Sequence, residues 1–162
     1  MTAPVAQEAG ELAQRYAAAI DEGDLDAAAG LFAEDAVLLL PEPPRELEPI
    51  HRHEGRQAIR QALSSVFDVR ATIHELTGQV VDTDAARASG RVSCVAHHYL
   101  DDHDRPDRSE TAIDLVWRVR YDDEYIHRGG RWLIAARALT VLAVELHPVR
   151  AVLPRGGIRL LP

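Results

Sequence analysis

The stretch RYAAAIDEGDLDAAAGLFAEDAVLLL, Arg15–Leu40, changes from a helical pattern to an extended one and decides the fold. It continues a set of apolar residues at helical spacing, namely Val5, Ala9, Leu12, Tyr16 and Ile20. This spacing predicts a first amphipathic helix, which Gly23 should end. Asp24 can cap a second, short helix, because its carboxylate can accept from backbone N–H groups. The run Ala36–Leu40 then predicts a first strand.

Beyond that stretch the apolar pattern changes its period once. Pro41–Pro49 holds four prolines and is expected to be a loop. A third helix should open near Gly55, with an apolar face at Ile59, Leu63, Val66 and Phe67. An alternation of period two follows and predicts four long strands, Ala71–Val81, Ala86–Leu100, Thr111–Tyr125 and Trp132–Leu146. Helices followed by a run of antiparallel strands predict an α+β fold, with the helices on one face of a curved sheet.

Length and composition fit one globular domain. The chain has 162 residues, of which 46% are hydrophobic and 27% charged. A domain of this size buries about 70% of the surface that its unfolded chain exposes. We place the domain at residues 1–146. Residues 147–162 are rich in proline and glycine, and we expect an extended tail that covers a ligand pocket or contacts a second subunit.

Charge and residue usage argue against several functions. The net charge of −8 disfavours binding to nucleic acid or anionic membranes. The chain has no lysine, so no Schiff base can form, and its only cysteine, Cys94, excludes an internal disulfide or a cysteine-based metal cluster. Met1–Gly10 lacks the pattern of a signal peptide, and no apolar run approaches the length of a membrane span. We therefore expect a cytoplasmic protein.

Alternation along the strands decides which side chains can meet inside the protein. In Ala86–Leu100 the even positions are small and apolar, and the odd positions are mostly polar. His98 therefore belongs to the buried face, whereas His97 should point outward. By the same reasoning, Trp117 and Tyr121 share the inner face of the next strand. The small side chains around His98 leave room on that face for a ligand or for helix side chains.

Three segments, in this order, resemble the SnoaL-like and scytalone-dehydratase-like branch of the NTF2-like superfamily. They are the opening stretch Arg15–Leu40, HEGRQAI at 53–59 and YDDEYIHRGGRWLIAARAL at 121–139. The resemblance runs from about Leu12 to Val144. It implies a cone-shaped fold, in which three N-terminal helices and a curved, mostly antiparallel sheet surround one pocket.

The resemblance also implies a set of catalytic positions. Scytalone dehydratase uses an aspartate at the end of its first helix and two histidines on neighbouring strands, and Asp21, His74 and His98 match these positions. The related hexachlorocyclohexane dehydrochlorinase uses an Asp–His dyad with an arginine on the last strand, which matches Arg137. The alternation of the last strand leaves the face of Arg137 open, because both of its faces are apolar.

Two positions depart from the pattern of scytalone dehydratase. Tyr121 stands where that enzyme has a pocket asparagine, and Ile20 stands where it has a tyrosine beside the catalytic aspartate. The resemblance alone therefore does not assign the substrate of the dehydratase, or its positioning of water, to this chain. SnoaL-type polyketide cyclases also use an Asp/His acid–base site, so cyclisation stays open as a reaction.

An imidazole beside a carboxylate is a poised proton carrier, because the carboxylate fixes the tautomer and stabilises the imidazolium. We expect His74, oriented by Asp21, to remove a proton from a carbon acid or a hydroxyl. His98 or Tyr121 would protonate or hold the leaving oxygen, and Arg137 would stabilise developing negative charge. This chemistry needs no metal and no cofactor.

The implied activity is that of a lyase, isomerase or cyclase acting on a small, hydrophobic, cyclic or polyketide-like molecule. Tyr16, Tyr121, Trp117 and Ala96 are expected to contact this substrate. Members of the superfamily commonly pair through the open face of the sheet, so the resemblance also implies a homodimer or a higher homo-oligomer.

The same residues have simpler interpretations. Asp21 can end the first helix in an Asp-Glu-Gly turn, a lone strand histidine is often structural, and Arg137 can be a surface ion-pair partner. The histidines and aspartates at residues 97–104 favour a solvated hairpin loop over a metal site. His51 and His53 are expected in the proline-rich loop, near the mouth of the pocket.

Two further functions stay open. One is a non-catalytic small-molecule binder or assembly subunit, which would keep the pocket without the chemistry. The other is an epoxide hydrolase, which needs an Asp–Arg–Asp arrangement and is disfavoured because Asp114 lies on the polar face of its strand. The enzyme hypothesis predicts that Asp21 lies within hydrogen-bond reach of His74 or His98 and that all of these residues line one cavity. The binder hypothesis predicts that Asp21 points to solvent.

Overall fold

The computed structural model describes residues 3–65, 69–84, 87–101 and 112–153. Within them the order of elements is α1 (Ala3–Glu22), α2 (Leu25–Gly30), β1 (Phe32–Glu42), β2 (Glu46–Glu54), α3 (Arg56–Ser64), β3 (Ala71–Asp84), β4 (Arg87–Asp101), β5 (Ala112–Arg128) and β6 (Arg131–Val149). This order confirms the predicted α+β fold, with helices first and long strands after them. No helix among the described residues is both long and apolar enough to span a bilayer.

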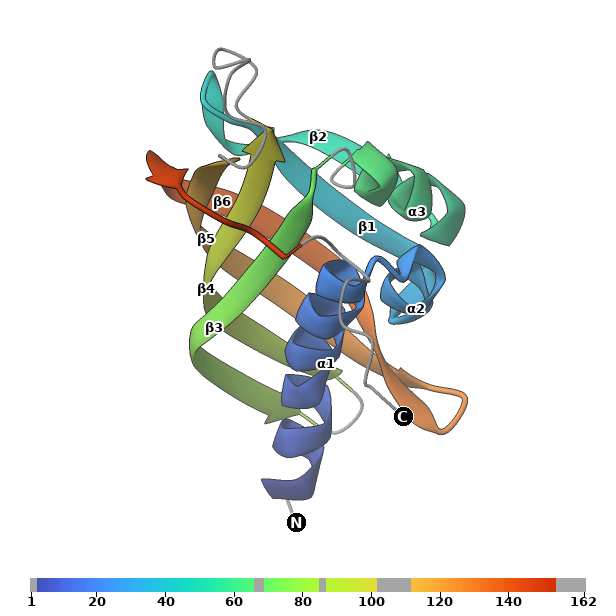
Figure 1. Ribbon diagram of the computed structural model, residues 1–162. Coiled ribbons are helices and arrows are strands. Elements are labelled where there is room, and N and C mark those ends of the chain that lie inside the picture. Colours follow the sequence, from blue (N-terminus) through green and yellow to red (C-terminus); the bar gives the residue numbers. More distant parts are fainter. Residues whose placement is uncertain (1–2, 66–68, 85–86, 102–111, 154–162) are drawn as a thin grey trace, which may run out of the picture.

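The strands form one curved sheet in the order β2-β1-β6-β5-β4-β3. Neighbouring strands are antiparallel except β1 and β6, which run parallel. The sheet wraps around α1, which lies on its concave face next to β3, while α2 and α3 lie beside β1 (Figure 1). The residues that could form a site therefore lie between α1 and the concave side of β3 to β6.

Helix α1 is held on the sheet by one buried face. Its inward residues follow the predicted helical spacing, and they are Ala9, Leu12, Ala13, Tyr16 and Ile20. The helix ends at Gly23, whose φ of 80° lies in the left-handed region that favours glycine. Asp24 then caps α2 as predicted, since its carboxylate accepts from the backbone N–H of Ala27 at 2.9 Å. Asp21 is thereby fixed in the last turn of α1.

The predicted loop at Pro41–Pro49 is wrong for most of its length. Strand β1 continues to Glu42, and β2 begins at Glu46 and pairs with it. Proline is tolerated in β2 because this strand lies at the edge of the sheet and leaves one row of its backbone groups unpaired. His51 and His53 consequently stand on an edge strand instead of in a loop.

Other predicted ends differ by a few residues. Strand β3 continues through the expected turn at Asp82–Asp84, and β6 continues to Val149, past the predicted end at Leu146. Both extensions are paired with a neighbouring strand, so the hydrogen-bond ladder extends them. Val66 and Phe67, expected in the third helix, lie outside the described residues, and so do residues 154–162 of the expected tail.

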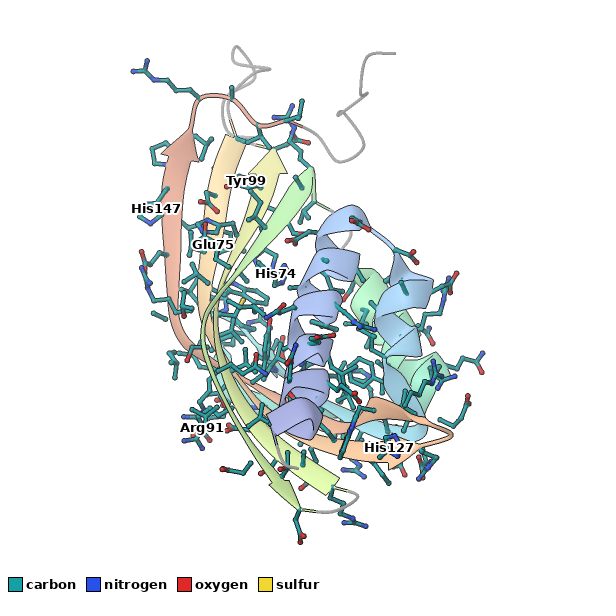
Figure 2. All side chains as sticks on the ribbon, turned by 90° about the horizontal axis from the view of Figure 1, so that it is seen from below. His74, Glu75, Arg91, Tyr99, His127 and His147 are labelled. Carbon is teal, nitrogen blue, oxygen red and sulfur yellow. The ribbon has the colours of Figure 1, made fainter. Side chains whose placement is uncertain are left out.

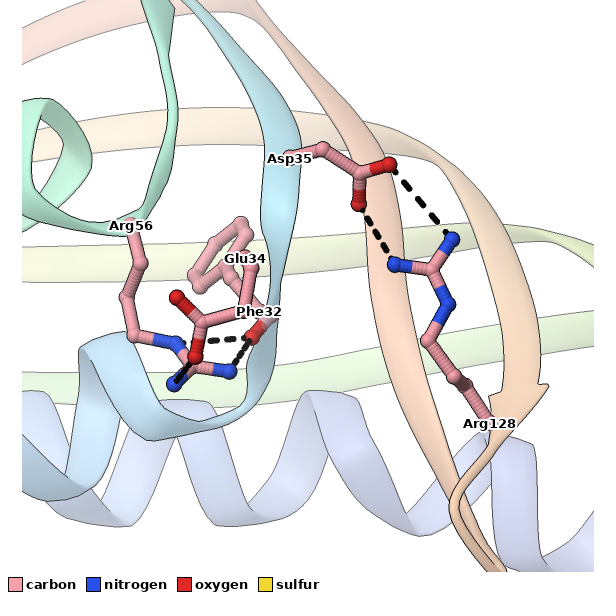
Figure 3. A network of polar contacts seen from close by, with 5 residues as sticks. All are labelled: Phe32, Glu34, Asp35, Arg56 and Arg128. Carbon is pink, nitrogen blue, oxygen red and sulfur yellow. Dashed lines mark hydrogen bonds and ion pairs between the residues drawn. The ribbon is translucent and has the colours of Figure 1, made fainter.

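Two arginines tie the ends of other elements to β1 (Figure 3). Arg56, at the start of α3, donates to the carbonyl oxygen of Phe32 at 2.7 and 3.1 Å and pairs with Glu34. Arg128, at the end of β5, pairs with Asp35 through its Nη1 at 2.8 Å. These contacts hold α3 and the β5–β6 hairpin around the start of β1, away from the expected site residues.

Candidate active site

The expected meeting of Asp21 with an imidazole occurs between α1 and β3. Asp21 Oδ1 lies 2.7 Å from His74 Nδ1 and accepts from the hydroxyl of Thr72 at 2.9 Å. Asp21 Oδ2 accepts from the backbone N–H of His74 at 2.8 Å. His74 points from β3 toward α1, whereas Glu75 points to the opposite side of the strand (Figure 2). The carboxylate therefore holds both the ring and the backbone of the same histidine.

The surroundings of Asp21 favour its ionised form. Burial acts to raise the pKa of this carboxyl, but the hydrogen bonds from the ring and backbone of His74, together with the Thr72 hydroxyl, outweigh burial and lower the pKa. An ionised carboxylate only accepts hydrogen bonds, so His74 Nδ1 carries the hydrogen. In a neutral imidazole with hydrogen on Nδ1, the other nitrogen, Nε2, holds the lone pair and has the form of a general base.

His98 stands beside His74 on β4, as its strand phase predicts. His98 is only 5% exposed, and its Nδ1 lies 3.1 Å from the carbonyl oxygen of Leu115. The two histidine rings meet edge to face, with centroids 6.1 Å apart. Burial is the main reason why the pKa of His98 falls to about 4, so this ring is neutral at pH 7.

Ala96 and Trp117 complete this part of the concave face. Ala96 lies directly opposite His74 on β3 and opposite Trp117 on β5. The Trp117 ring is 4.6 Å from the His98 ring, centroid to centroid. Its Nε1 is buried and has no hydrogen-bond partner among the described residues. A buried donor without an acceptor costs about 1–3 kcal/mol. Asp21, His74 and His98 are the residues at which we expect proton transfer, and we call them the proton-transfer centre.

The side chain of Arg137 points into the interior of the protein. The alternation of its strand did not decide between the two faces of the sheet. It is 0% exposed and donates to both oxygens of Asp123 at 2.7 Å. Its guanidinium lies between the rings of Tyr16 and Tyr121, 4.4 and 4.5 Å from their centroids. Burial by itself lowers the pKa of Arg137, but the charge and hydrogen bonds of Asp123 outweigh it and raise the pKa. The alternative interpretation of Arg137 as a surface ion-pair partner is therefore wrong, because its partner is a buried carboxylate.

The pair Asp123–Arg137, which we call the buried ion pair, is a second polar centre. The Tyr125 hydroxyl donates to Asp123 at 2.7 Å, and Arg137 Nη1 has no partner among the described residues. Tyr16 connects the two centres, since it lies five residues before Asp21 on α1, about 7.5 Å along the helix axis. The buried ion pair thus sits deeper along the same concave face.

Asp123 was not among the expected site residues, although the sequence carries a signal for it. The inner-face alternation that places Trp117 and Tyr121 continues at the next odd positions with Asp123 and Tyr125, which are 3% and 1% exposed. A carboxylate on an apolar strand face needs a cationic partner. The alternation does not identify that partner, Arg137, because it lies on the neighbouring strand β6.

His97 lies on the other face of the sheet from His98, as predicted. Its Nδ1 is 2.7 Å from Asp114 Oδ2, and its ring stacks on Tyr99. No group of three potential metal ligands occurs among the described residues, and the expected loop residues 102–104 lie outside them. Four surface hollows of the described part are lined without Asp21, His74 or His98, so a deep pocket at the proton-transfer centre stays a prediction.

The fold defines the class: a curved sheet wrapped around N-terminal helices is the architecture of NTF2-like proteins. An NTF2-like protein of unknown function from Pseudomonas putida superimposes with a TM-score of 0.66 at 15% identity, covering 86% of this chain and 88% of that one. The chain belongs to the family of SnoaL-like domains, whose model matches residues 5–138.

Two solved structures named for enzymes that remove water or hydrogen chloride share the fold. A candidate scytalone dehydratase from Novosphingobium aromaticivorans has a TM-score of 0.72 and 24% identity, with 98% of both chains covered. A hexachlorocyclohexane dehydrochlorinase (LinA) of type 2 has a TM-score of 0.67 and 16% identity, covering 99% of this chain and 94% of that one. No curated protein matches the sequence.

Proposed function

We propose that the protein is a cofactor-independent acid–base enzyme, a dehydratase, isomerase or cyclase for a small, neutral, hydrophobic cyclic molecule. The observation that carries the proposal is the 2.7 Å contact between Asp21 Oδ1 and His74 Nδ1. It leaves His74 Nε2 as a base beside His98 on the concave face. A positioned base of this kind contributes about 10²–10⁴-fold to the rate.

In the proposed reaction, His74 Nε2 removes a proton from carbon, and Asp21 stabilises the imidazolium that forms. Arg137 takes a narrower role than its charge suggests, because Asp123 already neutralises it. Its remaining donor, Nη1, can hydrogen-bond the oxygen on which negative charge develops. The names of the structural neighbours, a candidate dehydratase and a dehydrochlorinase, support proton abstraction followed by loss of a leaving group.

The proposal is tested with β-tetralone, a neutral bicyclic ketone whose α-protons a positioned base can remove. In deuterium oxide, the protein should catalyse incorporation of deuterium into the ketone, measured by mass spectrometry. His74→Gln should lower this rate by about 10²–10⁴-fold. The control His51→Gln changes an exposed histidine on β2 and should leave the rate unchanged.

The alternative is a non-catalytic binder, and one observation favours it. Arg137 is fully buried and two of its N–H donors already bind Asp123, so these donors cannot stabilise charge on a substrate. A binder would retain β-tetralone without exchanging its protons. Exchange that is absent in the wild type, or equal in the wild type and His74→Gln, would remove the case for catalysis.

A further inference from the structure

Two residues of β3 hold the Asp21 carboxylate from the same face of the sheet. Thr72 and His74 are two positions apart on the strand, so both side chains point toward its concave side. The Thr72 hydroxyl donates to Asp21 Oδ1 at 2.9 Å, and His74 Nδ1 reaches the same oxygen at 2.7 Å. The backbone N–H of His74 donates to Oδ2 at 2.8 Å. Thr72 therefore binds the oxygen that holds the imidazole ring.

Thr72 is itself held firmly in place. It is only 3% exposed, and β3 pairs with β4 in unbroken register from Ala71 to Leu76, with Thr72 directly opposite His98. A β-branched side chain has few rotamers, so little conformational freedom is lost when its hydroxyl binds. The hydroxyl has one hydrogen to donate, and the ionised carboxylate accepts it. The strand thus places a rigid donor at the end of α1.

Asp21 receives less support from its own helix. It lies in the last turn of α1, which ends at Glu22, and Gly23 follows with a φ of 80°. The Asp21 side chain is 26% exposed, so water competes for its oxygens. A carboxylate that turned toward water would leave His74 Nδ1 without the acceptor that fixes its tautomer. The orientation of the base therefore depends on the groups that keep the carboxylate turned inward.

We propose that Thr72 is a positioning residue of the proton-transfer centre, whose hydroxyl keeps the Asp21 carboxylate turned toward His74. This inference rests on the proposed function where it concerns the reaction rate, because Thr72 acts through Asp21 and not by contact with the substrate. If Thr72 only filled space between the helix and the sheet, a valine of the same shape would serve equally well. A positioning role requires the hydroxyl itself.

The charge of Asp21 agrees with this role. Burial acts to raise the pKa of the carboxyl, and the hydrogen bonds from His74 and Thr72 outweigh burial and lower the pKa. Removing the Thr72 hydroxyl takes away one of these bonds, so the pKa of Asp21 should rise toward its ordinary value of about 3.9. The orientation of the carboxylate and its affinity for a proton should therefore change together.

The first test uses the protein without ligand. Nuclear magnetic resonance of protein labelled with ¹³C-aspartate follows the Asp21 carboxyl downward from pH 7. We expect its pKa to lie below about 3.9 in the wild type, to rise in Thr72→Val and to return toward the wild-type value in Thr72→Ser. The control Thr77→Val removes an exposed hydroxyl of the same strand, which donates to the Ser93 carbonyl oxygen at 3.3 Å, and should leave Asp21 unchanged. An Asp21 pKa that is equal in the wild type and in Thr72→Val would overturn the proposal.

The second test measures deuterium exchange into β-tetralone over a range of ketone concentrations, which separates kcat from KM. Thr72→Val should lower kcat by about 10–100-fold and leave KM unchanged, because the variant loses a hydrogen bond to a charged group that does not bind the ketone. Thr72→Ser should retain most of the wild-type kcat, and Thr77→Val should retain all of it. A wild-type kcat in Thr72→Val, or a loss confined to KM, would refute the positioning role.

A double variant decides whether Thr72 acts through Asp21. In Asp21→Ala, the further change Thr72→Val should have no additional effect on kcat, because the hydroxyl no longer has a carboxylate to hold. Losses that multiply in the double variant would show that Thr72 acts in another way and would overturn the proposal.

The two proposals can fail separately. A wild type without deuterium exchange would refute the catalytic proposal, and the titration of Asp21 would still decide the role of Thr72. Exchange that depends on His74 but not on the Thr72 hydroxyl would refute this inference alone. If Thr72→Val fails to fold by circular dichroism, Thr72→Ala takes its place with the same expected rise in the pKa of Asp21. A wild-type Asp21 pKa at or above about 3.9 would overturn the inference whichever variants fold.

Discussion

The proton-transfer centre and the buried ion pair each hold a carboxylate beside a nitrogen cation or base, but their surroundings differ. In the buried ion pair, the side chains of Asp123 and Arg137 are both 0% exposed, and two parallel hydrogen bonds join them. In the proton-transfer centre, the Asp21 side chain is 26% exposed and the His74 side chain 7%. Asp123 and Arg137 bind each other through both carboxylate oxygens, whereas the Asp21–His74 pair leaves His74 Nε2 without a partner among the described residues.

This difference in exposure suits the buried ion pair to a structural role and the proton-transfer centre to a chemical one. A fully buried bidentate pair has little freedom to exchange a proton, and breaking it leaves an uncompensated charge in the interior. A half-buried pair with one free lone pair can change its protonation without unfolding the protein. We therefore expect substitutions at Asp123 to act on folding, and those at Asp21 and His74 to act mainly on proton transfer.

The largest effect should come from Asp123→Ala. The variant leaves the Arg137 guanidinium buried without its partner, which should lower the free energy of unfolding by about 3–5 kcal/mol, measured in urea. Its neighbour Asp122 pairs with Arg91 and Arg120 on the exposed face of β5, so Asp122→Ala should cost less than about 1 kcal/mol.

A double variant sharpens the same comparison. Replacing the pair together, Asp123→Leu with Arg137→Met, removes both charges and should recover most of the loss seen in Asp123→Ala. A double variant as unstable as Asp123→Ala would show that Arg137 stabilises the protein through its packing against the tyrosine rings, and that its ion pair with Asp123 is not the main contribution.

A smaller effect should appear in the pH dependence of stability. The pKa of His98 is about 4 in the folded state and near 6.5 when unfolded, so the unfolded chain binds the proton more tightly. The stabilisation is complete above pH 6.5 and is lost as the pH falls toward 4. Between pH 7 and pH 5, His98 should account for a loss of about 2 kcal/mol, measured by urea unfolding.

The comparison variants for this prediction are His98→Phe and His147→Phe. His98→Phe should flatten the pH dependence, whereas His147, whose side chain is 55% exposed, should have no such influence. A slope that survives in His98→Phe would mean that the buried imidazole is not what titrates.

The smallest effect should follow from Asp21→Asn. Because the folded pKa of Asp21 is lowered, its stabilisation is present above the unfolded pKa near 3.9 and is lost as the pH falls through the folded value. The variant should be less stable than the wild type by about 1–2 kcal/mol at pH 7, and the difference should shrink below about pH 4. The control Glu22→Gln, an exposed carboxylate in the same turn, should match the wild type at both values of pH. A difference that persists in acid would contradict the assigned charge of Asp21.

Much of this architecture could be predicted from local patterns. The apolar spacing of α1 and the alternation of β4 and β5 gave the correct elements, and they placed His98 inward and His97 outward. The proline-rich segment failed because proline content predicts backbone restrictions, not the position of a strand in a sheet. At the edge of the sheet those restrictions cost little, and β2 forms there.

The sequence by itself determined the helices, the strands other than β2, and the faces on which the residues of β4 and β5 stand, because these depend on spacings of two to four residues. Only the tertiary structure decided which of these residues meet. Asp21 and His74 are 53 positions apart, and Asp123 reaches Arg137 across a hairpin of 14 positions. Such contacts depend on the register and curvature of the sheet, and no local pattern encodes either.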